Sequence, residues 1–322
     1  MARLKRNNAA APVAEDASLR IRAAWLYYNQ GLTQKEVSER LGVSRGTVIR
    51  ILAEAVERGD VQIRINAAEA SCVDLAGRLE AAFGLDEAIV APVAEGDATK
   101  AVGLALGQFL SDAMIAGMTV GVGWGRTLMA SIPALRPARH DNVRIVSLLG
   151  GIVEARTGNP LEFSWRFASQ VGADCYLMVA PAIVDSTATK RRLIEHCGLD
   201  RLFDMASSLD LAVVSVGDIG LKATSLAAGM ITPGELKELV ALGAVADVLS
   251  NFLDAEGQSV PHALNRRVMS VDLEAIRDAG HVLIATGGAH RAAAIRAAIR
   301  RIGCNTLITD ESAARALLAP AS

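Results

Sequence analysis

The chain has 322 residues, 51% of them hydrophobic, and a formal net charge of −2 at pH 7. This length excludes a lone DNA-binding module and suggests two domains, and the apolar content is ample for a large core. The four cysteines at positions 72, 175, 197 and 304 form no CxxC pair, which argues against a zinc site or a disulfide framework.

Residues 1–17 precede the first helical pattern, and we expect them to form a disordered tail. The first residues are basic but lack the apolar segment of a signal peptide. No apolar run in the chain reaches the length needed to span a membrane. We therefore expect a cytoplasmic protein without a membrane partner.

Residues 18–66 have the pattern of a small DNA-binding domain. A supporting helix is predicted over Ser18–Asn29, and an alternating short strand is predicted over Val61–Ile65. The apolar residues expected to share one side of the supporting helix and to pack within this domain are Ile21, Ala24, Trp25 and Tyr28.

Two short helices joined by a tight turn are predicted at residues 33–52. Thr33 and Glu36 have the spacing of a capping box. Gly42 follows the last apolar residue of the first helix, where a left-handed residue ends a helix, and Ser44 is a favoured N-cap for the second. This is the pattern of a helix-turn-helix, whose second helix presents side chains to base edges. We expect that helix to turn Val48, Ile49 and Leu52 inward.

The side chains expected to bind DNA are Gln34, Ser44, Arg45, Thr47 and Arg50. Arginine suits guanine edges and phosphates, and amides and hydroxyls suit phosphates or bases. Residues 1–66 carry a net charge of +4 and the remainder carries −6, so positive charge is concentrated where DNA would bind. The alternative left open is a helical hairpin with a solvated, charged face.

From residue 67 to residue 322, apolar runs of strand length alternate with helical patterns. This alternation is typical of an α/β domain with a mostly parallel sheet covered on both faces. The predicted strands are Ala88–Ala91, Thr119–Val122, Val143–Leu149, Cys175–Val179, Leu211–Val216, Val282–Thr286 and Thr306–Ile308. The predicted helices include Lys100–Ala116, Glu162–Val171, Thr187–His196, Pro233–Leu242 and Arg291–Arg301.

Four glycine clusters follow predicted strands, at the edge where ligands bind in parallel α/β sheets. The sharpest reads Gly123-Trp124-Gly125-Arg126-Thr127. Its glycines let the backbone approach a ligand, and the following helix N-terminus and Arg126 favour an anion such as a phosphate. It is neither a dinucleotide fingerprint, because Arg126 replaces the third glycine, nor a Walker A loop. A tight strand-to-helix turn is the alternative for the glycines, and hydrophobic packing is the alternative for Trp124.

Together these motifs resemble the SorC family of sugar-binding transcriptional regulators along nearly the whole chain. The matching stretches are residues 33–52, 123–127, 150–151, 243–247, 252–254, 265–268, 287–288 and 305–311. Within the family the chain looks most similar to repressors of erythritol or related polyol catabolism. The resemblance implies an effector and oligomerisation domain similar to sugar-phosphate isomerases, with the catalysis lost.

The resemblance also implies partners. We expect a homotetramer, a dimer of dimers, that binds double-stranded operator DNA under the control of a sugar or polyol phosphate, with no cofactor and no metal. The competing function is an active sugar-phosphate isomerase that carries a DNA-binding domain. That activity needs a general base beside the sugar. Asp218 or Asp247 could serve, but the sequence gives no convincing base-and-acid pair.

Carried over by motif, the effector-binding residues are Gly123, Trp124, Gly125, Arg126, Thr127, Gly151, Asn159, Asp247, Gly287, Gly288 and Arg291. The family commonly has lysine where Arg291 stands. The position therefore keeps a positive charge, which is carried by a planar guanidinium group in place of an ammonium group. This leaves open a different anion or an unphosphorylated effector. Asp247 matches a family acid that bonds ligand hydroxyls, with a helix cap as its alternative. Asn159 could equally be a turn former beside Gly158 and Pro160.

Overall fold

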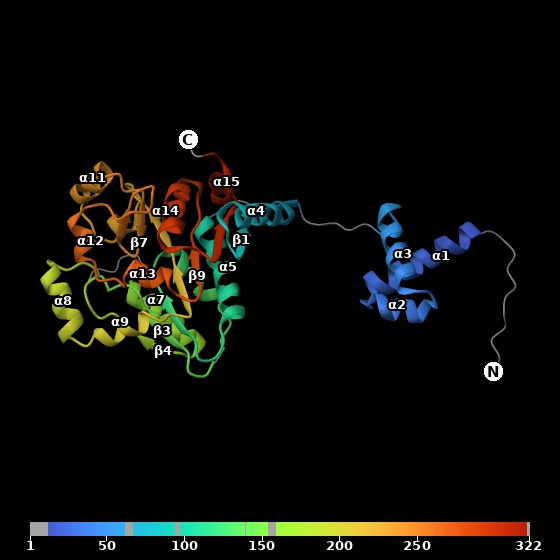
Figure 1. Ribbon diagram of the computed structural model, residues 1–322, viewed down its shortest axis with the longest axis horizontal. Coiled ribbons are helices and arrows are strands. Elements are labelled where there is room, and N and C mark those ends of the chain that lie inside the picture. Colours follow the sequence, from blue (N-terminus) through green and yellow to red (C-terminus); the bar gives the residue numbers. More distant parts are fainter. Residues whose placement is uncertain (1–11, 62–66, 94–96, 139, 154–158, 321–322) are drawn as a thin grey trace. The chain divides into compact units, whose positions relative to one another are not determined.

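The computed structural model describes residues 12–61, 67–93, 97–138, 140–153 and 159–320 (Figure 1). The chain divides into two compact units, residues 1–66 and 67–322. The strand expected at Val61–Ile65 falls on residues 62–66, which lie outside the described residues, as do residues 1–11 of the expected tail.

The first unit is a bundle of short helices. They are α1 (Pro12–Ala24), the π-helical turn η1 (Trp25–Asn29), α2 (Gln34–Leu41) and α3 (Arg45–Glu57). Residues 12–17 are therefore helical, and their assignment to a disordered tail was wrong. Proline is favoured in the first helical turn, since its missing N–H would have no partner there and its φ suits a helix.

The expected inward face of the first helix was also wrong. Ile21, Trp25 and Tyr28 are 56%, 53% and 44% exposed, and only Ala24 of the four is buried. Helix α1 packs on α3 through a different side, where Ala23 is fully buried and Arg20 pairs with Asp60.

In α3 the buried residues are Val48, Ile51, Leu52 and Ala55, spaced at three and four residues as a single helical face requires. Ile49, which we expected to face inward, is 48% exposed. It is one residue removed from Val48 and so points to a different side of the helix.

The second unit is built on a seven-stranded parallel sheet in the order β1-β10-β9-β5-β2-β3-β4. The strands are β1 (Glu87–Ala91), β2 (Thr119–Val122), β3 (Arg144–Ser147), β4 (Asp174–Tyr176), β5 (Leu211–Val214), β9 (Val282–Ala285) and β10 (Thr306–Asp310). All seven predicted strands are confirmed, β2 with the predicted bounds and the other six with shifted ends. Their apolar character on both sides follows from burial, and β2, β5, β9 and β10 are buried throughout.

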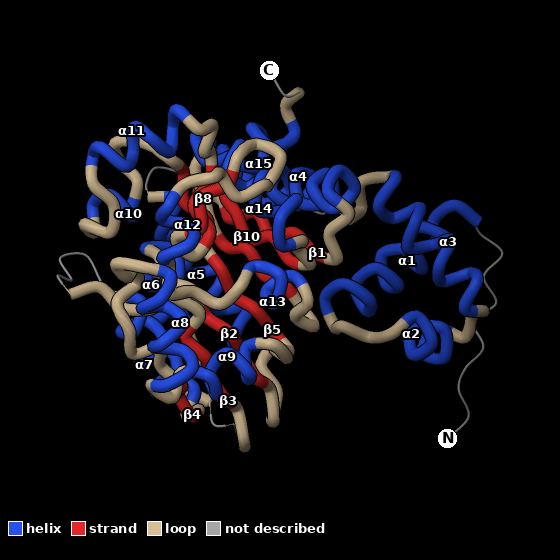
Figure 2. Tube along the Cα trace, turned by 60° about the vertical axis from the view of Figure 1, so that its left-hand side comes forward, coloured by secondary structure: helices blue, strands red, loops and turns tan. Residues whose placement is uncertain are grey.

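Helices cover both faces of this sheet (Figure 2). One core contains apolar residues of α5 (Ala98–Ala113), α6 (Arg126–Met129) and α7 (Pro160–Val171). The other contains residues of α4 (Ala67–Phe83), α9 (Asp200–Ala206), α13 (Leu273–Arg277), α14 (Ala292–Ile302) and α15 (Glu311–Leu318). The expected α/β class is confirmed. None of the described helices is long and apolar enough to cross a membrane.

A small antiparallel sheet was not predicted. It is formed by β6 (Val216–Asp218), β7 (Ala246–Val248) and β8 (Asn251–Leu253). Strands of three residues are too short to show an alternating pattern. Near this sheet the chain also forms α10 (Thr224–Ala227), α11 (Pro233–Ala241) and α12 (Ala263–Arg267), while α8 (Thr187–His196) and the short turns η2 (Ile132–Ala134) and η3 (Ala289–Arg291) complete the unit.

Candidate functional site

The helix-turn-helix has the caps that its sequence predicts. The Thr33 hydroxyl accepts from the Glu36 N–H at 3.3 Å, and the Glu36 carboxylate accepts from the Thr33 N–H at 2.8 Å. The Thr33 N–H and the Thr33 hydroxyl both donate to the Glu36 carboxylate and lower its pKa. Gly42 ends α2 at φ +70°, and the Ser44 hydroxyl accepts from the Thr47 N–H at 3.0 Å. The turn between α2 and α3 is therefore fixed locally.

The five residues expected to bind DNA differ in availability. Arg45 is exposed, and its Nε lies 3.4 Å from Oε1 of Gln34. The hydroxyls of Ser44 and Thr47 bond each other at 2.8 Å. Arg50 is exposed but forms an ion pair with Glu54. Because Glu54 offsets the charge of Arg50, Arg45 is the cation best placed to carry a base or phosphate contact.

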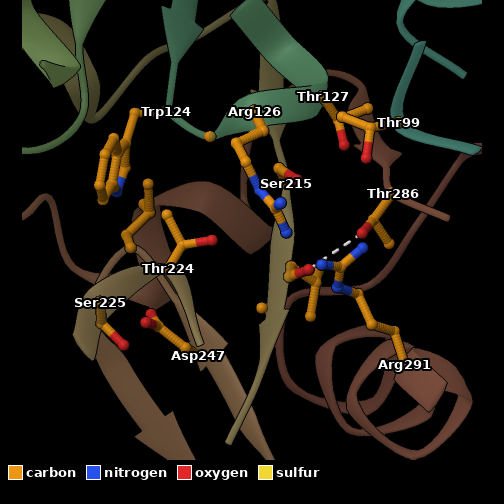
Figure 3. A pocket seen from close by; sticks show the side chains of 14 residues that line it. Thr99, Trp124, Arg126, Thr127, Ser215, Thr224, Ser225, Asp247, Thr286 and Arg291 are labelled. Carbon is orange, nitrogen blue, oxygen red and sulfur yellow. Dashed lines mark hydrogen bonds between the residues drawn. The ribbon is translucent and has the colours of Figure 1, made fainter. Parts of the chain in front are cut away.

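A pocket opens at the carboxyl ends of the central strands of the second unit (Figure 3). It contains about 500 Å³ of empty space, part of it open to solvent. Its lining comes from segments far apart in sequence: the loop after β2, the junction of β5 and β6, the end of β9, α10, and β7 with its turn. The lining residues are Thr99, Trp124, Gly125, Arg126, Thr127, Ser215, Val216, Gly217, Thr224, Ser225, Asp247, Leu249, Thr286 and Arg291.

Two arginines reach into the pocket from different sides (Figure 3). Arg126 is exposed, and its side chain makes no hydrogen bond or ion pair with any described residue, although its charge helps to lower the pKa of Asp97. The side chain of Arg291 is only 11% exposed, and it is held by the Asp218 carboxylate at 3.2 Å and by the Gly287 carbonyl at 2.6 Å. Arg291 is thus a positioned cation whose charge is partly balanced by Asp218, whereas the guanidinium of Arg126 has no hydrogen-bonded carboxylate partner among the described residues.

Hydroxyl groups also line the walls of the pocket. They belong to Thr99, Thr127, Ser215, Thr224, Ser225 and Thr286. The Thr286 hydroxyl donates to the Val216 carbonyl at 3.0 Å and so ties β9 to β6. Ser225 is 1% exposed, and its hydroxyl has no hydrogen-bond partner among the described residues. A buried hydroxyl of this kind gains most from a ligand or a water molecule that can bond to it.

Asp247 lies beside Ser225 and across the pocket from Arg126 (Figure 3). Burial raises its pKa to about 6, and the nearby Asp218 carboxylate adds to this effect, while the hydrogen bond from the Ser250 N–H opposes it. One of its oxygens accepts from the Ser250 N–H at 2.8 Å. The other side of the carboxylate is available to ligand hydroxyls, which are hydrogen-bond donors.

Six of the eleven expected effector-binding residues line this pocket, and five do not. The amide of Gly123 donates to the Val213 carbonyl, and that of Gly288 donates to the Asp310 carboxylate at 2.5 Å, so neither amide is free for an anion. Gly287 is buried beneath Arg291 as its carbonyl partner. Gly151 borders a separate hollow beside Met230. Ligand contacts from these residues stay predictions.

Asn159 is the N-cap of α7, the turn-forming role that its sequence left open. Its side chain accepts from the Leu161 N–H at 3.1 Å and donates to the Ile152 carbonyl at 2.7 Å. Both polar atoms of its amide are therefore occupied. Among the described residues there is no cluster of His, Cys, Asp and Glu that could hold a metal.

Sequence reasoning missed eight lining residues, five of which carry a hydroxyl: Thr99, Ser215, Thr224, Ser225 and Thr286. Two of these five had a usable signal, because Ser215 and Thr286 are the last or next-to-last residues of predicted strands that lead into glycine clusters. Thr99 lies in the first turn of α5, and Thr224 and Ser225 lie in the short helix α10. Only the folded chain brings those three to the strand ends.

Comparisons with known proteins decide the family. The Sugar-bind family, which describes a sugar-binding domain, matches residues 68–319, and region 4 of sigma-70 matches residues 25–58. The chain is 34% identical to the erythritol catabolism regulatory protein EryD of Brucella abortus, over 94% of this chain and 97% of that protein. The chain belongs to the SorC family of sugar-binding transcriptional regulators. It is accordingly a DNA-binding transcriptional regulator.

Other members agree in length and fold. The SorC-family chain is 30% identical to the deoxyribonucleoside regulator of Bacillus subtilis, over 94% of this chain and 98% of that protein. The structure of the full-length sorbitol operon regulator SorC from Klebsiella pneumoniae superposes with a TM-score of 0.72 at 25% identity, covering 95% of this chain and all of that one. The resemblance inferred from the motifs is thereby confirmed.

Proposed function

We propose that this SorC-family protein is a repressor of a sugar or polyol catabolic operon and that a phosphorylated sugar or polyol in the pocket controls its binding to operator DNA. The observation that carries the proposal is the pairing of Arg126 and Arg291 over a hydroxyl-lined pocket with Asp247 on the far side. Cations suit the phosphate. The carboxylate and the hydroxyls suit the polyol end. EryD, a 34% identical relative, is named as an erythritol catabolism regulator.

The mechanism we propose is a shift in population between arrangements of the assembled protein. The effector must bind one arrangement better than another, since a ligand with equal affinity for both changes nothing. Operator recognition by paired helix-turn-helix units depends on their spacing. We propose a homotetramer as the assembly in which occupancy of the pocket changes that spacing.

A competing function, sugar-phosphate isomerisation, has one observation in its favour. The raised pKa of Asp247, about 6, suits a general base near neutral pH. The reaction also needs a group that donates a proton to the substrate oxygen, and apart from Asp247 the titratable residues that line the pocket are the two arginines. We therefore propose a non-enzymatic protein. An assay of aldose–ketose interconversion tests this, and turnover above background contradicts it.

Replacing Arg126 with alanine tests the effector site directly. An operator duplex is first selected from random sequences, and its binding is then followed by fluorescence anisotropy with and without sugar and polyol phosphates. We expect Arg126→Ala to keep operator affinity and to lose the response to the phosphates. The matched control is Arg136→Ala. Arg136 is an exposed arginine in the segment that leads into the amino-terminal end of β3, whereas the pocket lies at the carboxyl ends of the strands. A wild-type response in Arg126→Ala contradicts the assignment of the site.

A further inference from the structure

The two-residue turn between β7 and β8 has an uncommon backbone. Leu249 and Ser250 have φ values of +52° and +59°, a left-handed conformation that crowds an L side chain. Two-residue hairpins favour positive φ at both central positions, which Asn-Gly or Gly-Gly usually fill. Among the other described non-glycine residues only Asn142 has a positive φ, and asparagine tolerates it well. A leucine held this way is a reason to look for a function.

The turn is held by groups other than the leucine side chain. The Asp247 carboxylate accepts from the Ser250 N–H at 2.8 Å. The side-chain amide of Asn251 donates to the carbonyls of Val248 and Leu249 at 3.2 and 3.1 Å and to the Ser270 hydroxyl at 3.0 Å. All these bonds would hold a glycine at position 249 equally well. The geometry of the turn therefore does not require leucine.

The Leu249 side chain forms part of the pocket wall instead. It is 4% exposed and lines the pocket together with Trp124 and Asp247. A Cβ atom placed on Gly123 would come within 2.9 Å of its Cδ2, so the leucine packs directly against the backbone of the loop after β2. Because its backbone is held in the β7–β8 turn and its side chain packs against this loop, it cannot easily move aside for a larger ligand.

We propose that Leu249 determines specificity by limiting the size of the effector, closing the pocket beside Asp247 to longer polyol chains. The inference rests on the proposed function, because it assumes that the pocket binds a polyol or sugar phosphate. Apolar walls discriminate ligands that differ by one carbon unit by about 10- to 200-fold. Leu249→Gly removes the wall while suiting the left-handed backbone.

The test is a calorimetric titration of the full-length protein with glycerol 3-phosphate, erythritol 4-phosphate, ribitol 5-phosphate and sorbitol 6-phosphate. Ser250→Gly is the matched control, since Ser250 has the same backbone conformation and is buried but does not line the pocket. The quantity compared is the affinity for the longest phosphate divided by the affinity for the phosphate that the wild type binds best. For Leu249→Gly we expect this ratio to rise at least about tenfold. For Ser250→Gly we expect the wild-type ratio.

A structural role alone would change the melting temperature without changing this ratio. Leu249→Asn, which also tolerates positive φ, provides a second variant if the glycine variant fails to fold, and its ratio should rise in the same direction. An unchanged ratio in the Leu249 variants, or an equal change in Ser250→Gly, overturns the inference alone. A wild-type protein that binds none of the four phosphates overturns the proposed function along with it.

Discussion

Replacing Asp247 with asparagine should stabilise the protein and weaken effector binding at the same time. Burial raises the pKa of Asp247 from an ordinary 3.8 to about 6. Each unit of pKa corresponds to about 1.4 kcal/mol, so the ionised carboxylate costs the folded state on the order of 2–3 kcal/mol above pH 6. Asparagine keeps the oxygen that accepts the Ser250 N–H but carries no charge. It loses the carboxylate that we propose accepts ligand hydroxyls.

The pH dependence follows from the direction of the change. A group with a raised pKa binds its proton more tightly in the folded state, so wild-type stability rises as pH falls from about 6 to about 4. The advantage of Asp247→Asn should therefore be about 2 kcal/mol or more at pH 7.5 and should vanish near pH 4. Urea unfolding of both proteins at a series of pH values measures it.

A control separates this effect from a general gain on removing negative charge. Asp278→Asn removes an exposed carboxylate that pairs with the neighbouring Arg277, and surface pairs of this kind contribute at most about 1 kcal/mol. We expect no comparable pH-dependent difference for this variant. If Asp247→Asn is no more stable than wild type at pH 7.5, or binds the effector equally well, the reasoning about this carboxylate fails.

Two further predictions concern the DNA contact and the packing behind the pocket. Arg45→Ala should weaken operator binding by about 1–3 kcal/mol and leave effector binding intact. Anisotropy titrations measure this, with Arg58→Ala at the far end of α3 as the control. Equal losses of operator affinity in the two variants would contradict the prediction. Gly103→Ala should lower stability by about 1–3 kcal/mol and weaken effector binding, because the new Cβ would lie 2.5 Å from the Ala130 Cβ and 2.9 Å from the Thr127 carbonyl oxygen. Gly77→Ala, which meets nothing within 4 Å, should instead be neutral or stabilising in thermal melts.

The large sheet could be predicted because burial on both faces leaves a continuous apolar signal in each strand. The helix-turn-helix could be predicted because its caps are local, as with Thr33, Glu36 and Ser44. The side of a helix that becomes buried was harder to predict. The sequence does not indicate that α1 packs on α3 with the small Ala23 buried and Trp25 exposed. The apolar period alone allowed either side of α1 to face inward.

The residues of the candidate site also differ in how far the sequence pointed to them. The loop from Trp124 to Thr127 was visible as a motif, and Asp247 and Arg291 came from family resemblance. Ser225 and Leu249 had no signal, because the small sheet and α10 bring them to the pocket through contacts between segments distant in sequence. The ligand contacts expected at Gly123 and Gly288 stay predictions, and their amides bond to the protein itself.

The most direct test of the central claim is a crystal structure of the protein grown with the polyol phosphate that binds it best. We expect the phosphate group to contact Arg126 and Arg291 and a ligand hydroxyl to donate to the Asp247 carboxylate. Density that places the ligand elsewhere, or a pocket filled by its own side chains with no anion near either arginine, would contradict it.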